Sequence, residues 1–338
     1  MSTKVIAFFN NKGGVGKTSL VYHIAWMLAD QGLRVLAVDL DAQGNLSAAF
    51  LDEDRLEELW PENQAGETIY GALRPLIRGV GDVAEPHLEI IDPRLVLMPG
   101  DMNLWDFENS LSDAWPKCLA GDQRAFWVTS AFWRVMQKGA VKHRADVIVV
   151  DLGPNLGAIN RAALIASDFV VIPLVPDLFL LQGFENLGST LRQWRSEWME
   201  RIPKNPDPDL DLPSGRMEPI GYIIMRHSLL RDRGPKAYVK WTAKIPSVYR
   251  EFVLGSLEAN PPVATDDEYC LAVLKHYRSL MPLAGEARKP MFFLKPADGA
   301  LGAHTYAVQE AYKDFRKLAR EIARRSAIQF PQEQPIPG

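Results

Sequence analysis

Residues Asn11–Ser19 read Asn-Lys-Gly-Gly-Val-Gly-Lys-Thr-Ser, and this stretch decides the fold. An apolar run typical of a buried strand, Val5–Phe9, precedes it, and Leu20–Ala29 follows with the spacing of a helix. Glycines allow the backbone to turn tightly, so that successive N–H groups converge on an anion beside the positive end of the helix. A strand, a glycine-rich turn and a helix in this order predict a phosphate-binding loop.

The loop also supplies side chains for phosphate and for a metal ion. Lys17 is placed to reach the β- and γ-phosphates of a nucleotide, and the Thr18 hydroxyl is placed to coordinate Mg²⁺. The usual spacing, G-x-x-x-x-G-K-[ST], begins with a glycine where this chain has Asn11. The residues expected to hold the phosphates are Gly13, Gly14, Val15, Gly16, Lys17, Thr18 and Ser19.

An additional lysine, Lys12, stands at the start of the loop. In this respect the loop resembles the deviant Walker A loop of the ParA/MinD family of ATPases. The resemblance implies that Lys12 crosses a dimer interface to reach the phosphates on the partner subunit. The alternative is that Lys12 is a solvated loop lysine.

A second apolar strand, Arg34–Asp39, ends in a carboxylate, and Asp41 follows it closely. In open parallel sheets, ligands bind at the carboxyl ends of the strands, so both aspartates are expected beside the phosphate loop. The stretch from Val38 to Asn45 resembles the second motif of the family, with Ala42 where proline is common. The resemblance implies that Asp41 holds the hydrolytic water and that Asp39 supports the metal shell. Alternatively, the two side chains form a helix N-cap and a turn.

A third strand, Ala145–Asp151, has the Walker B pattern, in which an apolar run ends in an acid. Asp151 is expected to accept hydrogen bonds from a magnesium-bound water. Residues 153–176 resemble the third motif of the family and its next strand almost position by position. A chance phosphate loop would not be followed by two acid-ended strands and this third block in the right order.

The expected nucleotide is ATP, with Mg²⁺. The chain has no N-K-x-D motif of the guanine-specific type. Gly221–Met225 is interpreted as a further strand, and residues just beyond the equivalent strand touch adenine in relatives. The resemblance therefore implies an adenine contact for Met225 or Arg226.

The expected fold class is α/β: a mostly parallel twisted sheet flanked by helices on both faces, of the P-loop NTPase, deviant Walker A type. Residues 1–330 are expected to form one ParA-like ATPase domain, and residues 331–338 a short polar tail. Three segments outside the resemblance, at about 51–94, 114–144 and 200–218, are interpreted as surface insertions that carry partner specificity.

Other segments lead to more local predictions. Aromatic residues at helical spacing within 114–144 are assigned to packing or to a protein partner, because such residues are more often core than a base-stacking platform. Residues 266–277 are interpreted as a helix, and 289–294 as a late strand. Residues 305–325 have the pattern of a long amphipathic helix.

Charge is distributed unevenly along the chain. Residues 1–225 carry 20 Lys or Arg against 30 Asp or Glu, whereas residues 226–330 carry 18 against 11. The last third is therefore where DNA would bind, since contacts to phosphate give sequence-independent affinity. The alternative is a solvated helix face. The candidate DNA contacts are Arg231, Arg233, Lys236, Lys240, Lys244, Lys313, Lys317 and Arg320.

Composition excludes several other classes of protein. With 338 residues and 47% hydrophobic content, the chain can bury a large core. No apolar run reaches the ~18–20 residues that span a bilayer, and the tail is unlike the basic membrane helix of MinD-type members, so a cytoplasmic protein without membrane binding is expected. Cys118 and Cys270 have no C-x-x-C partner, which argues against a disulfide framework and a zinc or iron–sulfur site.

Together these observations predict a ParA-like Mg-ATPase that forms a homodimer around two ATP molecules and hydrolyses them slowly. Nonspecific DNA binding, association with the nucleoid and an adaptor or activating protein are expected to serve partitioning or positioning of DNA or cargo. One alternative is an ATP-dependent regulatory or defence-system subunit that acts through a protein partner without binding DNA. Another is a metabolic ligase or kinase that transfers phosphate to a small acceptor. A nitrogenase-iron-protein-like electron donor is disfavoured, because Cys118 and Cys270 lie outside the ligand-bearing positions of that family.

Overall fold

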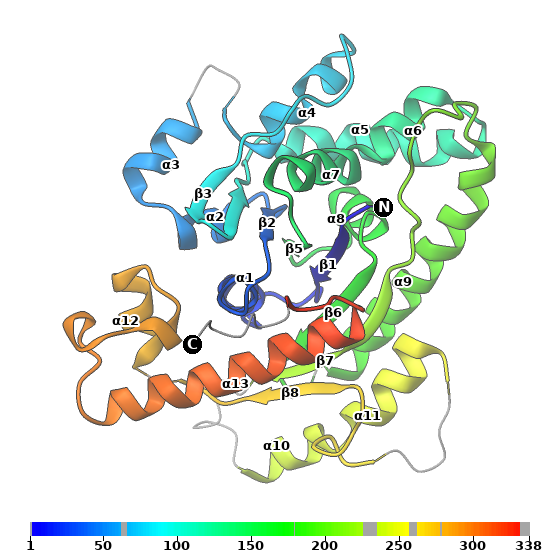
Figure 1. Ribbon diagram of the computed structural model, residues 1–338. Helices are drawn as coiled ribbons and strands as arrows, with labels where there is room; N and C mark the ends of the chain where they lie inside the picture. Colours follow the sequence, from blue (N-terminus) through cyan, green and yellow to red (C-terminus); the bar gives the residue numbers. More distant parts are fainter. Residues whose placement is uncertain are drawn as a thin grey trace.

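The computed structural model describes residues 2–61, 66–178, 180–225, 235–256, 262–277 and 279–331. Its centre is an eight-stranded sheet with the order β3-β4-β2-β5-β1-β6-β7-β8 (Figure 1). Neighbouring strands are parallel except β3 and β4, which are antiparallel. The strands are β1 (Lys4–Phe8), β2 (Val35–Asp39), β3 (Glu89–Asp92), β4 (Leu95–Met98), β5 (Val147–Asp151), β6 (Phe169–Leu174), β7 (Glu218–Met225) and β8 (Cys270–Leu274).

Helices cover both faces of the sheet, which confirms the predicted fold class (Figure 1). Alternate strand residues point to opposite faces, so that Ile6 and Phe8 enter one hydrophobic core and Val5 and Ala7 the other. The first core contains residues of α1 (Lys17–Asp30), α2 (Asn45–Phe50), α3 (Glu53–Leu59), α12 (Leu280–Ala287) and α13 (Ala303–Arg325). The second contains residues of α4 (Ile69–Arg78), α5 (Leu104–Leu119), α6 (Gln123–Thr129), α7 (Ala131–His143), α8 (Ala158–Ile165), α9 (Leu180–Arg201), α11 (Ile245–Val248) and the π-helix η3 (Tyr249–Leu254).

Short elements complete the described chain. Helix α10 (Pro235–Thr242) precedes α11, and three 3₁₀ turns are η1 (Ile202–Lys204), η4 (Met291–Phe293) and η5 (Pro296–Asp298). The helices predicted at Leu20–Ala29 and 305–325 are present as α1 and α13, and α13 buries Phe315, Leu318 and Ile322 against the sheet side. The apolar stripe of α13 is long enough to specify one face, whereas α1 is buried on most of its surface.

Two predictions for the last third were wrong. Residues 266–277 contain the strand β8 instead of a helix, and β8 pairs in parallel with the outer edge of β7. The apolar run Cys270–Leu274 is too short for periodicity to distinguish a strand from a buried helix. Residues 289–294 form the 3₁₀ turn η4 instead of a strand, and Phe292 and Phe293 pack edge-to-face against each other with ring centroids 4.9 Å apart. A strand would have sent these neighbouring rings to opposite faces.

The segments interpreted as insertions contain regular structure. Residues 51–94 hold α3, α4 and the antiparallel edge strand β3, which the sequence had not indicated. Within 114–144, the aromatic side chains of Trp115, Phe126 and Phe132 are buried in the core, so the packing interpretation is confirmed for these three. Between η1 and β7 the chain is irregular, as its prolines predict. That these segments are insertions relative to other proteins stays a prediction.

Candidate active site

The central strands β1, β2 and β5 have their carboxyl ends side by side. In the register of β1, β2 and β5, Phe8 is paired with Asp151 and Asp39 is paired with Asp151. The loop Asn11–Ser19 leaves β1 at the same level. The predicted meeting of the phosphate loop with both acid-ended strands is therefore confirmed, because parallel strands present their carboxyl ends together.

Glycine geometry shapes the phosphate loop. Gly14 (φ 72°) and Gly16 (φ 87°) have left-handed backbones that favour glycine. Helix α1 begins at Lys17 with Gly16 as its N-cap and has no side-chain cap, so its first N–H groups are open to an anion. A methyl group built on Gly16 would lie 3.3 Å from Cε of Met225, which places Met225 beside the loop. Its predicted contact with adenine stays a prediction, and Arg226 lies outside the described residues.

Lys17 is held among carboxylates. Its side chain is buried, and burial lowers its pKa, while the charges of Asp151 and Asp41 act to raise it. A cation fixed in this way loses little freedom when it meets phosphate oxygens. The predicted phosphate-binding role of Lys17 is thus consistent with its surroundings.

Asp151 is fully buried, and although the Thr18 hydroxyl lies close enough to stabilise its carboxylate, no hydrogen bond of ordinary geometry reaches either oxygen. Burial and, after it, the charge of the neighbouring Asp39 raise the pKa of this carboxyl to about 8, although Thr18 and Lys17 act in the opposite direction. An unsatisfied buried carboxylate is costly unless a ligand completes it. The oxygen donors Asp151 and Thr18 fit the preference of Mg²⁺ for hard oxygen ligands, directly or through water.

Asp39 is also fully buried, but it already has partners. Its Oδ2 accepts hydrogen bonds from the Ser47 amide at 2.8 Å and the Ser47 hydroxyl at 2.7 Å, and Oδ1 accepts from the Asp41 amide at 3.2 Å. Burial raises the pKa of the Asp39 carboxyl to about 6. Asp39 therefore anchors the start of α2, and its role near the metal stays a prediction. Ser47 was not predicted as part of the site.

Asp41 follows the end of β2 by two residues and is largely buried. Its Oδ1 accepts a hydrogen bond from the Gln43 amide at 3.0 Å, so the turn that was considered as an alternative does form. The N-cap of α2 is Gly44, so neither Asp39 nor Asp41 is the cap residue. A methyl group on Gly153, after β5, would lie 3.3 Å from Oδ1 of Asp41. Asp41 thus faces the segment that resembles the third motif.

That third segment is braced by Asn160. This buried side chain donates hydrogen bonds to the carbonyl of Gly153 at 2.8 Å and the carbonyl of Asn155 at 2.7 Å. It therefore fixes the turn between β5 and α8. The block whose sequence resembles the third motif is compact and lies against Asp41.

Lys12 forms an ion pair with Asp177 of the same chain. Asp177 follows β6, and the Lys12 amide donates a hydrogen bond to Oδ1 of Asn10 at 2.9 Å. The Lys12 side chain is 40% exposed, so it is solvated as the alternative interpretation has it, and it also pairs with a carboxylate of its own chain. The predicted reach of Lys12 to a partner subunit stays a prediction, and Asp177 was not predicted.

The buried side chain of His23 links α1 to η4 and α13. The Nδ1 atom of His23 lies 2.6 Å from the Ser19 carbonyl oxygen and donates to it, which leaves Nε2 to accept from the Met291 amide at 3.1 Å. The ring also stacks on Phe315 of α13 with centroids 5.1 Å apart. Burial lowers the pKa of His23 to about 4, so the ring is neutral in the folded protein at neutral pH.

This histidine predicts a pH-dependent stability. Between its folded pKa of about 4 and the ordinary value of 6.5, the unfolded chain binds a proton that the folded chain does not. The free energy of unfolding should therefore fall as the pH falls through this window, by up to ~1.4 kcal/mol per pH unit for this group. Urea denaturation at pH 4.5–7.5 measures this slope. A His23→Gln variant should be less stable at pH 7.5 and show a shallower slope, and an unchanged slope would contradict the assignment.

A family model described as an AAA domain matches residues 3–203, more than half of the chain. The chromosome partitioning protein ParA of Caulobacter vibrioides is 28% identical over 199 residues, which cover 59% of this chain and 66% of that protein. The chain is a ParA-like member of the AAA domain family.

Other relatives agree with this assignment. A protein named "Putative replication protein A" from Rhizobium rhizogenes is 32% identical over 237 residues, or 65% of this ParA-like chain, which spans 54% of that relative's length. Among solved structures, protein DIP2308 of Corynebacterium diphtheriae has a TM-score of 0.69 at 23% identity and covers 96% of this chain and 98% of its own. An ATP complex of McdA from Cyanothece has a TM-score of 0.59 at 15% identity, with 97% and 98% covered. These structures share the ParA-like fold.

The candidate DNA contacts of this ParA-like chain are only partly described. Arg231 and Arg233 lie outside the described residues, as does the side chain of Lys236. Lys240 and Lys244 are exposed, and their ammonium groups lie 5.5 and 5.2 Å from the ring centre of Trp241. On α13 the side chains of Lys313, Lys317 and Arg320 are exposed, and Lys313 pairs with Glu310 at 3.1 Å.

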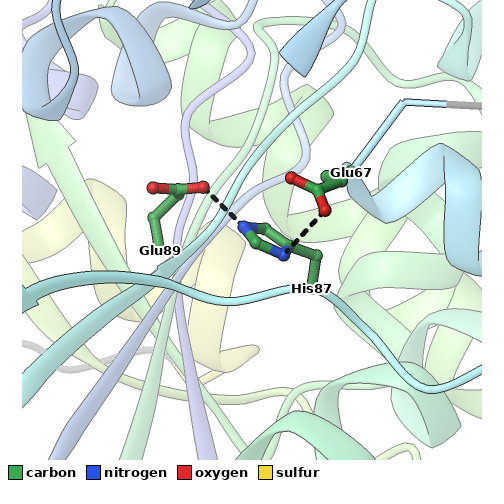
Figure 2. Close-up of side chains that lie close together, drawn as sticks. All are labelled: Glu67, His87 and Glu89. Atoms are coloured by element: carbon green, nitrogen blue, oxygen red, sulfur yellow. Dashed lines mark hydrogen bonds and ion pairs between the residues drawn. The ribbon is translucent and has the colours of Figure 1, made fainter. Parts of the chain in front are cut away.

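A second group of ligand-type side chains in this ParA-like chain lies beside β3. Figure 2 shows His87 between two carboxylates, with Nε2 2.5 Å from Glu89 and Nδ1 3.8 Å from Glu67. The guanidinium of Arg55 pairs with Glu89 at 2.5 Å and Glu67 at 3.0 Å. Because Arg55 already supplies a cation to both glutamates, the group is a salt-bridge network that ties α3 to β3.

None of the described helices is both long enough and apolar enough to cross a lipid bilayer.

Proposed function

We propose that this ParA-like protein is a Mg-ATPase that forms an ATP-dependent sandwich dimer and acts in partitioning or positioning DNA or cargo. The observation that carries this proposal is the convergence of Lys17, Thr18 and the buried carboxylate of Asp151 at the carboxyl ends of β1 and β5. Family membership supports ATP as the nucleotide.

The described residues suggest how hydrolysis is divided among them. The amides of the loop and the first turn of α1 bind the phosphates, and Lys17 neutralises charge between the β- and γ-phosphates. Bound Mg²⁺, held by Thr18 and through water by Asp151, supplies further charge neutralisation at the phosphates. Asp41 is the proposed group that orients the attacking water, since it follows β2 beside Lys17 and faces the segment after β5.

Exposed apolar side chains around the site support a dimer. Met102 (60% exposed), Trp105 (55%) and Leu178 (59%) are large hydrophobic residues open to solvent, and Leu156 is exposed at 37%. Each follows the carboxyl end of β4, β5 or β6, so all four lie on the nucleotide side of the sheet. Apolar residues gathered at one edge commonly mark an interface. A second copy would cover them while bringing its Lys12 to the nucleotide.

A DNA-binding experiment tests the cellular part of the proposal. The wild type should retard nonspecific duplex DNA in the presence of Mg-ATP, less with ADP, and with strong salt dependence. A Lys317→Glu, Arg320→Glu double variant should weaken retardation and reduce the salt slope by ~1 per lost phosphate contact. Lys204→Glu, an equally exposed lysine on η1, serves as the matched control.

An ATP-dependent dimer that never retards DNA at low salt would contradict the DNA-binding role. That result would favour the alternative of a regulatory subunit that acts through a protein partner. Light scattering on the same samples separates this outcome from a failure of dimerisation.

A further inference from the structure

Helix α8 begins directly after residues 153–157, which leave β5 and lie against Asp41; we call these residues the β5–α8 turn. The N-cap residue of α8 is Gly157, and it forms no side-chain cap. The first N–H groups of a helix have no partner within the helix, so a packed helix end needs acceptors for them. For α8, another part of the chain must supply these acceptors.

Glu108 of α5 supplies them. Its Oε1 accepts a hydrogen bond from the Ala158 amide at 2.5 Å, and its Oε2 accepts one from the Ile159 amide at 2.8 Å. Helix α5 lies beside α8 on the same face of the sheet (Figure 1). A carboxylate at the positive end of a helix gains charge-assisted hydrogen bonds and a favourable helix dipole. Glu108 therefore caps α8 from a neighbouring helix.

The cap is closely fitted to the β5–α8 turn. A methyl group built on Gly157 would lie 2.7 Å from Oε1 of Glu108 and 3.0 Å from Oδ1 of Asn155. The Gly157 amide donates to that same Oδ1 at 2.9 Å. A side chain at position 157 would therefore displace the capping carboxylate or the turn. The close fit fixes the position of the turn relative to α5.

The other end of the turn touches the candidate active site at two places. A methyl group on Gly153 would lie 3.3 Å from Oδ1 of Asp41. One on Gly13, in the phosphate loop, would lie 3.9 Å from Cγ of Pro154. The turn therefore lies against both the proposed water-orienting carboxylate and the loop that binds phosphate. A displacement of the start of α8 would move the turn relative to both.

Glu108 also lies close to the proposed dimer surface. Trp105, which is 55% exposed, precedes it by one helical turn on the same side of α5. A second copy that covers Trp105 would contact the helix that carries the cap. Contacts at the dimer surface and the position of the β5–α8 turn are thus connected through one short stretch of α5.

We propose that Glu108 is a positioning residue for ATP hydrolysis. By capping α8 it holds the β5–α8 turn against Asp41 and the phosphate loop, so it sets the rate of turnover and leaves nucleotide affinity to the loop and Lys17. Its effect passes through the turn, because its two carboxylate oxygens already accept backbone amides. This inference rests on the proposed function as an ATPase.

Two substitutions of Glu108 test the inference. Glu108→Gln keeps the shape and one acceptor oxygen but turns an NH₂ group toward a backbone N–H, whereas Glu108→Ala removes both acceptors. Misplacing reacting groups by about 1 Å can slow a reaction ~100-fold, so we expect single turnover to slow about tenfold in the Gln variant and ~100-fold in the Ala variant. Hydrolysis of radiolabelled ATP with the protein in excess measures these rates.

Two further measurements separate positioning from stability and from binding. Calorimetry with a non-hydrolysable ATP analogue should give affinities within about twofold of the wild type, because the phosphates are bound by the loop and α1. Hydrogen exchange of the amides of residues 157–159 should become faster in both variants, because their acceptors are lost or weakened. Glu108→Gln, the milder change, carries the test if Glu108→Ala does not fold.

Asp122→Ala is the matched control. Asp122 caps α6 in the same layer, where its Oδ1 accepts a hydrogen bond from the Ala125 amide at 2.8 Å. Removing this cap should lower the melting temperature, as Glu108→Ala does, and leave turnover unchanged. The comparison distinguishes a cap that positions the site from one that only stabilises a helix.

Three outcomes would overturn the inference. Folded Glu108 variants that hydrolyse ATP at the wild-type rate would make Glu108 an ordinary helix cap. Slower turnover that accompanies loss of the ATP-dependent dimer in light scattering would assign Glu108 to the interface. A wild type that binds ATP and does not hydrolyse it would overturn the proposed function and this inference together, and the wild-type sample alone identifies that case.

Discussion

Replacing Lys17 by alanine should abolish ATP binding, with a loss of at least ~100-fold in affinity, or ~2.7 kcal/mol. Lys17 is the cation buried between Asp151 and Asp41 at the start of α1, so no other described side chain can neutralise the phosphates from that position. Charge-assisted hydrogen bonds to phosphate are among the stronger polar contacts, and their loss in a buried site is not replaced by water. Isothermal titration calorimetry with Mg-ATP measures the change.

The control for this variant must separate binding from folding. Removing Lys17 leaves Asp151 and Asp41 without their cation, so the melting temperature of the variant should be compared with that of the wild type. Lys204→Ala, at an exposed position on η1, should bind ATP normally. A folded Lys17→Ala protein that binds ATP within a few-fold of the wild type would contradict the assigned phosphate site.

The sequence predicted those elements whose pattern had one structural solution. Asp39 and Asp151 each close a continuous apolar run, and such runs are typical of central parallel strands buried on both faces. Segments with short apolar runs were harder to predict. Cys270–Leu274 forms a strand only because β7 offers it an edge, and the Phe292–Phe293 turn depends on packing against His23 and Phe315. Such tertiary contacts override local preference.

In the candidate site, too, residues of a local motif were predicted, and residues that act through distant partners were not. Residues inside the loop motif were placed correctly beside the acid-ended strands, because the motif specifies its own geometry. Ser47 and Asp177 were missed, since each acts through a partner distant in sequence, Asp39 in one case and Lys12 in the other. The signal for Ser47 was weak: a serine in the first turn of α2, eight residues after Asp39. The signal for Asp177 was an acid directly after a predicted strand.

Replacing Lys12 by alanine should leave ATP binding within a few-fold of the wild type and abolish ATP-dependent dimerisation. In the single chain the Lys12 ammonium pairs with Asp177, whereas Lys17 occupies the place among the site's carboxylates. Lys12 therefore adds little to binding within its own subunit, and its expected contribution is to the phosphates of a partner. Light scattering with ATP, ADP and no nucleotide measures the dimer, and calorimetry measures nucleotide affinity.

The pairing of Lys12 with Asp177 makes this prediction more specific. To reach a partner's nucleotide, Lys12 must leave Asp177, so the ion pair competes with dimerisation. Because the pair is partly exposed, it should contribute only ~0.2–1 kcal/mol, and Asp177→Asn should strengthen the ATP-dependent dimer by up to about fivefold. If Lys12 instead only braces the loop, Lys12→Ala and Asp177→Asn would destabilise the fold alike and leave dimerisation unchanged. If Lys12→Ala weakens the ATP-dependent dimer and Asp177→Asn strengthens it, Lys12 contacts the partner subunit. Equal effects of the two variants would mean that Lys12 acts only within its own subunit.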